Sequence, residues 1–325
     1  MFWLCLFSCD AFTEQYNVAA DPTDNTAFIF TVPKGATARK LGNPLKEAGI
    51  IDDADDFGTY IKLSKEGSCI KAGRFSLTRS MTPKKIIETL CGTPLANDKA
   101  FTVLEGWRIK EIDEALAKEG WIQPGEYKKT VSNPSVFSAE FPLPKDTLEG
   151  YLYPETYMIS PDKFSVNAFV QRQLDTLHTN FYVPNKEALS KSKRSFHEII
   201  IMASMLEREE PNPKQRPMVS GIIWKRLDNK WNLGIDATSR YTIDVWNDRN
   251  AFLKQLYDPT DPYNTRLRPG LPLTPIGNAS AKSMEAALNP VESEYWYYLH
   301  DGDKILRPAK NEKEHNRNKK KYNVY

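Results

Sequence analysis

The chain has 325 residues, of which 40% are hydrophobic and 26% charged, and its formal net charge at pH 7 is +2. This composition is typical of a globular protein with two domains, or three small ones, that bury a real core. The nearly neutral charge argues against a nucleic-acid binder that works by bulk electrostatics, and we interpret the basic run at residues 317–321 as a solvated tail.

The cysteines and histidines do not have the spacing of a metal site. Cys5 and Cys9 lie in an apolar leader, Cys69 and Cys91 stand alone, and there is no C-x-x-C pair. We therefore expect neither a metal ion nor another cofactor. A disulfide between Cys69 and Cys91 and a pair of buried free thiols fit the sequence equally well.

The N-terminus begins with nine apolar or small residues. A membrane helix needs about 20 apolar residues, and a signal peptide needs a basic region before its apolar one. Neither is found in residues 1–9. We interpret residues 1–25 as the remaining end of a longer membrane anchor followed by a polar spacer.

The next part of the chain contains a passage that recurs 71 residues later. A β-prone run ends in a Gly turn, an apolar helix follows, and a second Gly stops it. A strand start of the form Gly-charged-aromatic then follows each copy, at Gly73 and at Gly125. We predict two related small α/β units over residues 26–95 and 96–158, with chance similarity as the alternative. The matched positions are Val32, Gly35, Leu41, Leu45, Gly49 and Ile51 with Val103, Gly106, Ile112, Leu116, Gly120 and Ile122.

The remaining elements are predicted from periodicity and from helix-start and turn signals. Thr82-Pro83 opens a helix, and a domain boundary is expected near residue 160 after an aromatic-rich loop. Helices are expected at 166–177, 197–209, 215–227 and 281–288, and a hairpin turned by Asp301-Gly302 joins 295–299 to 305–306. The expected fold class is α+β, with small α/β modules followed by a mixed α+β domain over residues 159–325.

The helix at residues 198–209 carries the best candidate for a catalytic acid. It is apolar almost throughout, and Glu207 lies at its C-terminal end. Burial and the helix macrodipole would both favour the uncharged acid there, as a general acid requires. The alternative is a carboxylate at the solvent edge of a core helix, paired with Arg208.

Two loops offer polar and aromatic side chains that suit a carbohydrate. The loop at 233–241 contains Asp236, Thr238 and Tyr241, although Asp236 could also cap the following helix through Thr238. The loop at 263–278 is rich in Pro and Gly, and such an extended loop buries its backbone poorly unless it lines a groove. Hydroxyl and amide groups along a groove bind sugar hydroxyl and acetamido groups, and aromatic rings cover sugar faces.

From about residue 29 to its end, the chain resembles the endolytic murein transglycosylase (MltG/YceG-like) family. The resemblance depends on an ordered set of short motifs at matching spacings. They are Ala203 to Glu209, Arg226-Leu227, Leu233 to Tyr241, Tyr263-Asn264-Thr265, Gly270-Leu271-Pro272, Pro275-Ile276, Ala286 to Pro290, Tyr298-Leu299, Asp301-Gly302 and Glu314-His315-Asn316.

The resemblance implies a membrane-anchored enzyme of the cell envelope whose catalytic domain, residues 159–325, faces outward from the cytoplasmic membrane. It would cleave the β-1,4 bond between N-acetylmuramic acid and N-acetylglucosamine within peptidoglycan strands, leaving 1,6-anhydromuramic ends. The family's catalytic Glu corresponds to Glu207, and the N-terminal module resembles a LysM-like peptidoglycan-binding region. The residues expected to contact the glycan strand are Ser204, Glu209, Asp236, Thr238, Tyr241, Tyr263, Asn264, Thr265 and Asn278.

The chain departs from the family pattern in its loops. Ala237 stands where a Pro is usual, Leu273-Thr274 replaces Pro-Gly, and Glu210 replaces a Thr. The alternatives are a non-catalytic glycan-binding scaffold that recruits wall-synthesis proteins and a hydrolase that uses Glu207 and Asp236 together. A hydrolase would need two carboxylates about 5 to 9.5 Å apart.

Overall fold

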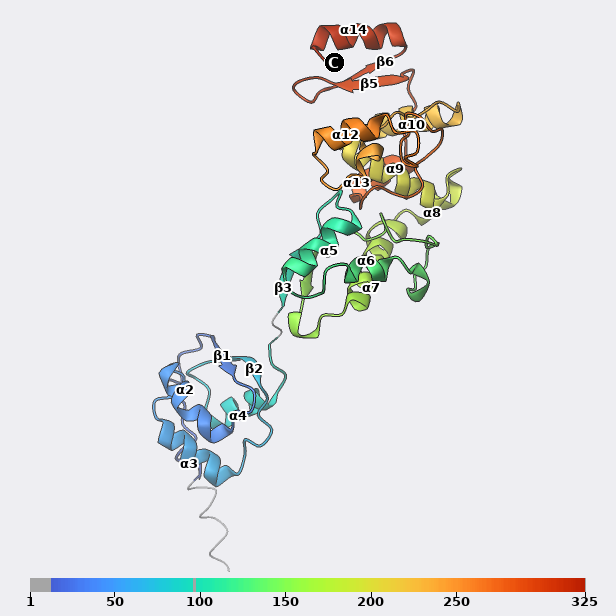
Figure 1. The fold of residues 1–325 in the computed structure, drawn as a ribbon. Coiled ribbons are helices and arrows are strands. Elements are labelled where there is room, and N and C mark those ends of the chain that lie inside the picture. The colour runs from blue at the N-terminus through green and yellow to red at the C-terminus, as the bar shows by residue number, and fades with distance from the viewer. Residues whose placement is uncertain (1–12, 96–97, 325) are drawn as a thin grey trace, which may run out of the picture. The chain divides into compact units, whose positions relative to one another are not determined.

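The computed structural model describes residues 13–95 and 98–324, and these fall into two compact units (Figure 1). Unit 1 ends at Asp98 and unit 2 begins at Lys99. Each unit has its own hydrophobic core. The predicted leader at residues 1–9 lies outside the described residues, and none of the described helices is both long and apolar enough to span a membrane.

Unit 1 is a two-stranded antiparallel sheet with helices between and after its strands. The register runs from Phe28 opposite Leu77 to Val32 opposite Gly73, and alternate residues of both strands face the core. The Thr82 side chain caps the last helix, whose first residue is Pro83, as predicted. The elements are β1 (Phe28–Val32), η1 (Ala38–Leu41), α2 (Gly42–Glu47), α3 (Ala54–Ser64), β2 (Gly73–Leu77) and α4 (Pro83–Cys91).

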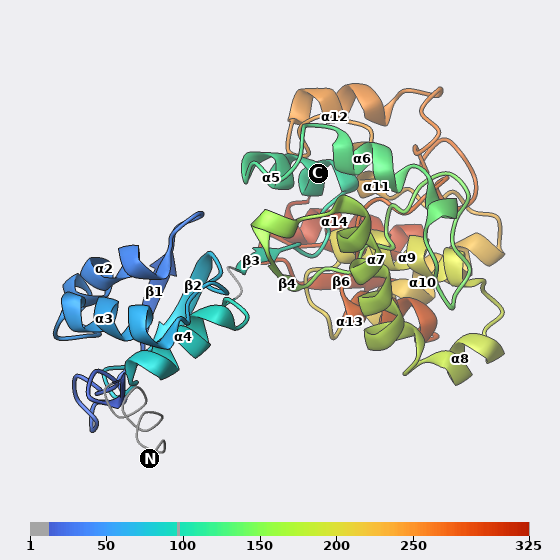
Figure 2. The same cartoon turned by 90° about the horizontal axis from the view of Figure 1, so that it is seen from below.

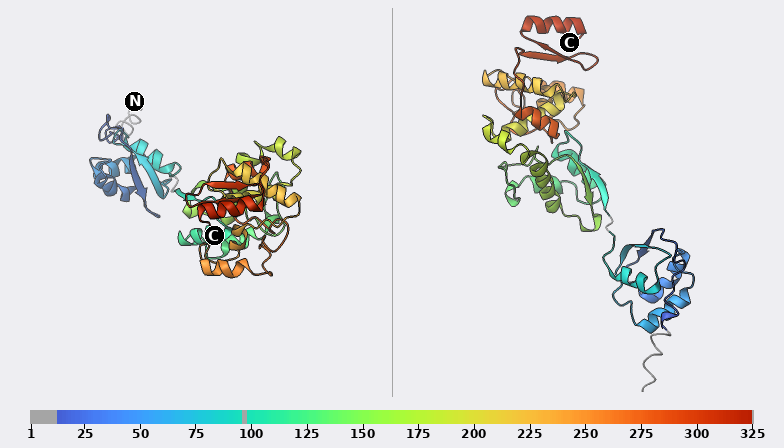
Figure 3. Two further views of the ribbon diagram at one scale, coloured as in Figure 1. Left: turned by 90° about the horizontal axis from the view of Figure 1, so that it is seen from above. Right: turned by 180° about the vertical axis from the view of Figure 1, so that it is seen from behind.

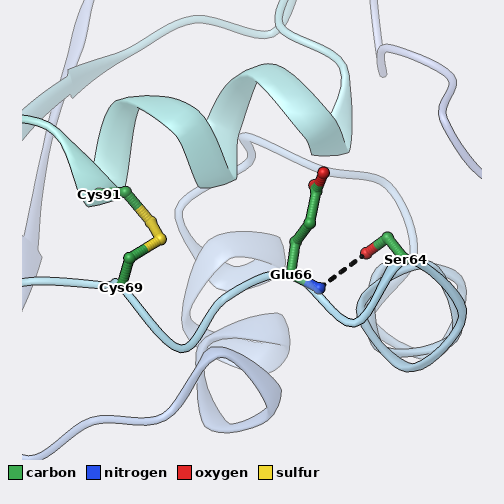
Figure 4. Close-up of a disulfide and its surroundings, with 4 residues drawn as sticks. All are labelled: Ser64, Glu66, Cys69 and Cys91. Carbon is green, nitrogen blue, oxygen red and sulfur yellow. Dashed lines mark hydrogen bonds between the residues drawn. A yellow bond between two sulfur atoms is a disulfide. The ribbon is translucent and has the colours of Figure 1, made fainter.

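A disulfide joins Cys69 to Cys91, which settles the question that the sequence left open (Figure 4). It ties the loop before β2 to the last residue of α4. The same loop begins with a hydrogen bond from the Glu66 amide to the Ser64 hydroxyl. The disulfide therefore anchors a segment that has no regular secondary structure of its own.

Unit 2 is mostly helical and contains two small antiparallel sheets, so the α+β prediction is confirmed. One sheet pairs β3 with β4 and the other pairs β5 with β6. The elements are β3 (Lys99–Thr102), α5 (Ile109–Lys118), α6 (Glu126–Val131), η2 (Pro134–Val136), β4 (Thr156–Ile159), η3 (Pro161–Lys163), α7 (Val166–Leu177), η4 (His178–Tyr182), α8 (Lys186–Lys191), α9 (Phe196–Glu209), α10 (Arg216–Asp228), α11 (Asp236–Arg240), α12 (Arg249–Leu256), α13 (Ala281–Leu288), β5 (Tyr297–His300), β6 (Leu306–Ala309) and α14 (Glu312–Tyr322).

The repeated passage has the same backbone plan in both units. Each copy is a strand, a helix, a second helix and a returning antiparallel strand, and the Gly residues that turn and stop the chain all have positive φ. The prediction that Gly125 starts a strand is wrong, because Gly125 precedes α6 and the returning strand is β4. The Asp113 carboxylate accepts the amides of Gly125 and Lys128 and thereby caps this helix.

The predicted boundary near residue 159 does not separate two compact units. β4 ends at Ile159 and pairs with β3, and one continuous core extends from Phe101 to Leu306. The segment 96–158, predicted as a separate unit, therefore contributes its helices and strands to the same body as the rest of unit 2.

The centre of unit 2 is α9, which packs against α10, α11 and α13 (Figure 2). Ser195 and Glu198 form a capping box at its start, and residues 199–206 are all buried. The predicted hairpin is confirmed as β5–β6, and α14 packs on both of its strands (Figure 3). The basic side chains at 317–321 are exposed to solvent as predicted, but they belong to the helix α14 and not to a tail. Acidic residues in the first turn of α14 and lysines in its last turn suit the helix macrodipole.

Candidate active site

Glu207 lies in the last turn of α9, and its side chain is only 7% exposed. Its carboxylate accepts two contacts from Arg216, Nη2 to Oε1 at 3.0 Å and Nη1 to Oε2 at 3.3 Å. Ser280 donates its amide at 2.8 Å and its hydroxyl at 2.6 Å to the same Oε2. Four hydrogen bonds thus fix the position of this carboxylate.

Three helix ends meet at this carboxylate. Arg216 is the first residue of α10, and Ser280 is the N-cap of α13. Arg216 is itself held in place, because its Nε donates to the Glu210 carbonyl at 2.9 Å and its Nη1 to the Ser280 hydroxyl at 3.0 Å. The N-terminal end of α13 and the guanidinium both favour negative charge at Glu207.

The expected environment of a neutral acid at Glu207 is therefore not what the structure contains. The macrodipole of α9 disfavours the carboxylate, but the start of α13 and the Arg216 ion pair act in the opposite direction. The alternative prediction, an ion pair between Glu207 and Arg208, is not found among the described residues either, because Glu207 pairs with Arg216. Arg208 instead donates to the Gly106 carbonyl, and its guanidinium carbon lies 4.0 Å from the ring centre of Trp246.

A second carboxyl group, Glu105, belongs to this site and was missed from the sequence. Partial burial raises the pKa of Glu105, and the nearby charge of Glu207 raises that pKa further. The next residue is fixed to the α13 side of the site, because the Gly106 amide donates to the Asn278 carbonyl at 2.6 Å. Gly277 passes so close that an added Cβ would lie 2.5 Å from the Gly106 oxygen. The sequence contained one signal for this residue. The two copies of the repeat differ in charge at this position, with Lys34 in the first copy and Glu105 in the second.

Glu209 points to a different part of unit 2 from Glu207. Tyr298 of β5 donates its hydroxyl to Glu209 Oε2 at 3.2 Å. Burial raises the pKa of Glu209, and the charge of Asp236 raises it further. Asp236 forms an ion pair with Arg266, at about 45% exposure of both side chains, and does not cap α11 through Thr238. Among the described carboxyls, Asp236 is thus coupled to Glu209, whereas Glu105 is coupled to Glu207.

Five of the predicted sugar-contacting residues are buried and use their polar atoms inside the protein. Asn278 accepts the Leu152 amide and donates to the Trp107 carbonyl, both at 2.9 Å. The other four residues likewise form hydrogen bonds to the backbone or to each other. This geometry indicates that the five side chains hold the loops in place and do not contact a sugar directly. The five residues are Ser204, Thr238, Asn264, Thr265 and Asn278.

Tyr241 and Tyr263 remain partly exposed and lie together, with ring centres 4.6 Å apart. Tyr241 donates its hydroxyl at 3.1 Å to Glu149, a carboxyl that is only 2% exposed. Burial raises the pKa of Glu149 to about 8, although it also accepts the Ile109 amide at the start of α5. Glu149, Tyr241 and Lys128 line a cavity of about 300 Å³.

No group of three or more His, Cys, Asp or Glu side chains within residues 13–95 and 98–324 is arranged to hold a metal ion. The titratable groups at the site are the carboxyls Glu207 and Glu105, with Arg216 and Lys282 as the cations beside them. Such an arrangement can exchange protons with a bound substrate.

Comparison with known proteins gives one consistent result. Residues 30–321 match the YceG-like family. The chain is 30% identical to the endolytic murein transglycosylase of Bacillus subtilis, over 91% of this chain and 85% of that protein. It is 23% identical to the endolytic murein transglycosylase of Streptococcus pneumoniae D39, over 88% of this chain but only 57% of that protein. A crystal structure of a YceG-like protein from Listeria monocytogenes matches with a TM-score of 0.58 and 25% identity, over 90% of this chain and 99% of that one. The chain therefore belongs to the YceG-like family.

Proposed function

We propose that this protein is a lytic transglycosylase that cleaves the β-1,4 bond between N-acetylmuramic acid and N-acetylglucosamine within peptidoglycan strands. Relatives named endolytic murein transglycosylases support activity on peptidoglycan. The observation that carries the residue-level proposal is a nearly buried carboxylate, Glu207, held by Arg216 and Ser280 beside a second carboxyl, Glu105.

The reaction needs one proton to be given and one to be taken back. Protonated Glu207 would donate to the glycosidic oxygen as the bond from C1 to that oxygen breaks. The muramic C6 oxygen would then attack C1, and Glu207 would take the C6 hydroxyl proton, so that no water is consumed. A hydrolase of the usual kind needs a second carboxylate to activate water or to attack the sugar.

The hydrogen bonds in the site bear on the second half of this reaction, in which Glu207 takes the C6 proton. Arg216 and Ser280 favour the carboxylate, which is the form that accepts the C6 proton. Glu105 holds its proton to higher pH than an ordinary Glu does.

The test is an analysis of products from isolated peptidoglycan by mass spectrometry. We expect fragments that end in 1,6-anhydromuramic acid, and only reducing ends would mean that the enzyme is a hydrolase. Glu207→Gln keeps the shape of the side chain and removes the acid, so turnover should fall at least about 100-fold. Glu187→Gln, an exposed position on α8, is the matched control and should leave turnover unchanged. A fully active Glu207→Gln protein would refute the assignment, and binding without any product would favour a non-catalytic scaffold.

We further propose that unit 1 is a LysM-like module that binds glycan strands, and that the protein works outside the cytoplasmic membrane, held by an N-terminal anchor near wall-synthesis proteins. The Cys69–Cys91 disulfide supports an oxidising location. External protease added to intact protoplasts should degrade the protein. The control is a cytoplasmic marker protein, which should stay intact. If this protein resists the external protease as well as that marker does, the proposed location is contradicted.

A further inference from the structure

An exposed aromatic cluster in unit 2 has no role in the chemistry described above. It consists of Trp231, Trp296 and Tyr297. The ring centre of Trp231 lies 4.8 Å from that of Trp296 and 5.8 Å from that of Tyr297. Trp231 nevertheless remains 40% exposed, which is unusual for so large an apolar side chain. We call these three residues the aromatic platform.

The platform is built rigidly. Arg226 Nε donates to the Trp296 carbonyl at 2.8 Å, and the Trp296 amide donates to the Ala309 carbonyl at 3.0 Å. Lys225 Nζ lies 4.7 Å from the ring centre of Trp296. Trp296 is therefore fixed between α10 and the β5–β6 hairpin, of which Tyr297 is the first residue.

The turn that presents Trp231 contains a strained residue. Lys230 has a φ of 58°, in the left-handed region that favours glycine, and the Trp231 amide then closes the end of α10 by donating to the Arg226 carbonyl at 2.9 Å. A backbone conformation that is unfavourable for lysine is thus combined with an exposed tryptophan immediately after it. A left-handed residue at this position is a common way for a helix to end, and here it fixes the direction in which Trp231 leaves α10.

The platform is also connected to the end of α9. The Arg226 guanidinium lies 5.6 Å from the ring centre of Tyr297 and 5.7 Å from that of Tyr298. Tyr298 in turn donates to Glu209, two residues after Glu207. The strand that carries Tyr297 is thus attached to the end of α9 through the neighbouring residue, Tyr298.

From this geometry we propose that the aromatic platform is an accessory subsite that stacks a pyranose ring of the glycan strand at a distance from the bond that is cleaved. The inference rests on the proposed function, because it takes the polymer to be an amino-sugar glycan. The apolar C–H face of a pyranose matches a flat indole ring, and the cations Lys225 and Arg226 suit a strand that carries carboxylates. Such a subsite would favour long strands over short oligosaccharides.

The experiment uses the full chain and long glycan strands freed of their peptide stems. Affinity is measured by calorimetry in Glu207→Gln protein, and KM and kcat are measured in otherwise unchanged protein. Trp231→Ala should weaken affinity about tenfold, with most of the kinetic loss in KM. Trp231→Phe should recover most of this affinity, since it keeps an aromatic face. Tyr257→Ala removes another exposed aromatic ring, 76% exposed, and should have no effect.

The outcomes separate the two proposals. Wild-type affinity and KM in Trp231→Ala protein would overturn the subsite, and so would an equal loss in Trp231→Phe protein. If Glu207→Gln protein still cleaves strands, the catalytic assignment fails. The effect of Trp231→Ala on affinity then tests the subsite independently of that assignment. A folding defect is detected by thermal unfolding, and Trp231→Phe then decides the case.

Discussion

At the scale of single residues, Glu207 shows how a nearly buried carboxyl group can have all its hydrogen bonds supplied by the protein. Its neighbours Arg216 and Ser280 replace the water that it loses, and they do so with a charge-assisted pair and two short hydrogen bonds. Glu149 is buried to a similar degree without a cation bonded to it, and burial raises its pKa to about 8. The two residues differ in the groups that face them and not in exposure.

Replacing Arg216 by Met should leave the Glu207 carboxylate buried without its partner. We expect the free energy of unfolding at pH 7 to fall by about 3 kcal/mol. In Glu207→Gln protein, the same Arg216→Met change should cost clearly less, because no charge is then left unpaired. Urea unfolding of the four proteins of this double-mutant cycle measures the difference, and strictly additive losses would mean that the ion pair contributes nothing.

The raised pKa of Glu149 gives a defined pH dependence. Between the ordinary value of 4.5 and about 8, the folded protein holds a proton that the unfolded chain releases. Raising the pH through this window therefore lowers the free energy of unfolding. Glu149→Gln removes the group, so the stability of the variant relative to wild type should improve by roughly 2 to 4 kcal/mol between pH 5 and pH 8.5. A constant difference across that range would contradict the assignment.

At the scale of elements, the β5–β6 hairpin is tied to the end of α9 by two contacts. Tyr298 donates to Glu209, and His300 Nε2 lies 3.0 Å from Glu210 Oε2, a carboxyl that is fully buried. These contacts join the helix that carries Glu207 to the strand that carries part of the aromatic platform. The hairpin itself could be predicted from the sequence, but its two contacts with the end of α9 could not.

His300 makes this connection sensitive to pH. Its hydrogen bond to Glu210 raises the pKa of the imidazole above the usual 6.5. The ion pair therefore stabilises the fold fully below that ordinary value, and its contribution is lost as the pH rises through the folded-state pKa. His300→Gln should lower Tm more at pH 6 than at pH 9, and it should speed hydrogen exchange in β5 and β6. His178→Gln, at a partly exposed position beside Glu140, is the control. An equal loss of Tm at both pH values would count against the ion pair.

At the scale of the whole molecule, the two units have separate cores, and unit 1 contains the only disulfide among the described residues. Its two cysteines are 22 residues apart in the chain. The cross-link therefore restricts a short loop of unit 1 and leaves the core of unit 2 untouched.

A protein with both Cys69 and Cys91 replaced by Ser should lose stability in unit 1 alone. Closing a loop of this size contributes about 3 kcal/mol in the chain-entropy account. Calorimetry of the full chain should show the transition of unit 1 at lower temperature and the transition of unit 2 unchanged. A shift of both transitions together would mean that the two units unfold as one.

Local signals in the sequence predict several of the elements and the position of the candidate acid, Glu207. Apolar periodicity, Gly stops and caps are local signals, so α7, α13 and the β5–β6 hairpin lie where they were predicted. The motifs around Glu207 were likewise enough to indicate the family.

The groups that surround Glu207 could not be predicted in this way, because they come from elements that are distant in the sequence. Arg216 and Ser280 come from two further helix ends, and Glu105 comes from a loop about a hundred residues earlier in the chain. The burial of Asn264, Thr265 and Asn278, which looked like sugar-binding residues, follows from hydrogen bonds between loops that are distant in sequence. A pattern along one chain records spacing within an element, whereas the charge and exposure of a side chain depend on which other elements fold against it.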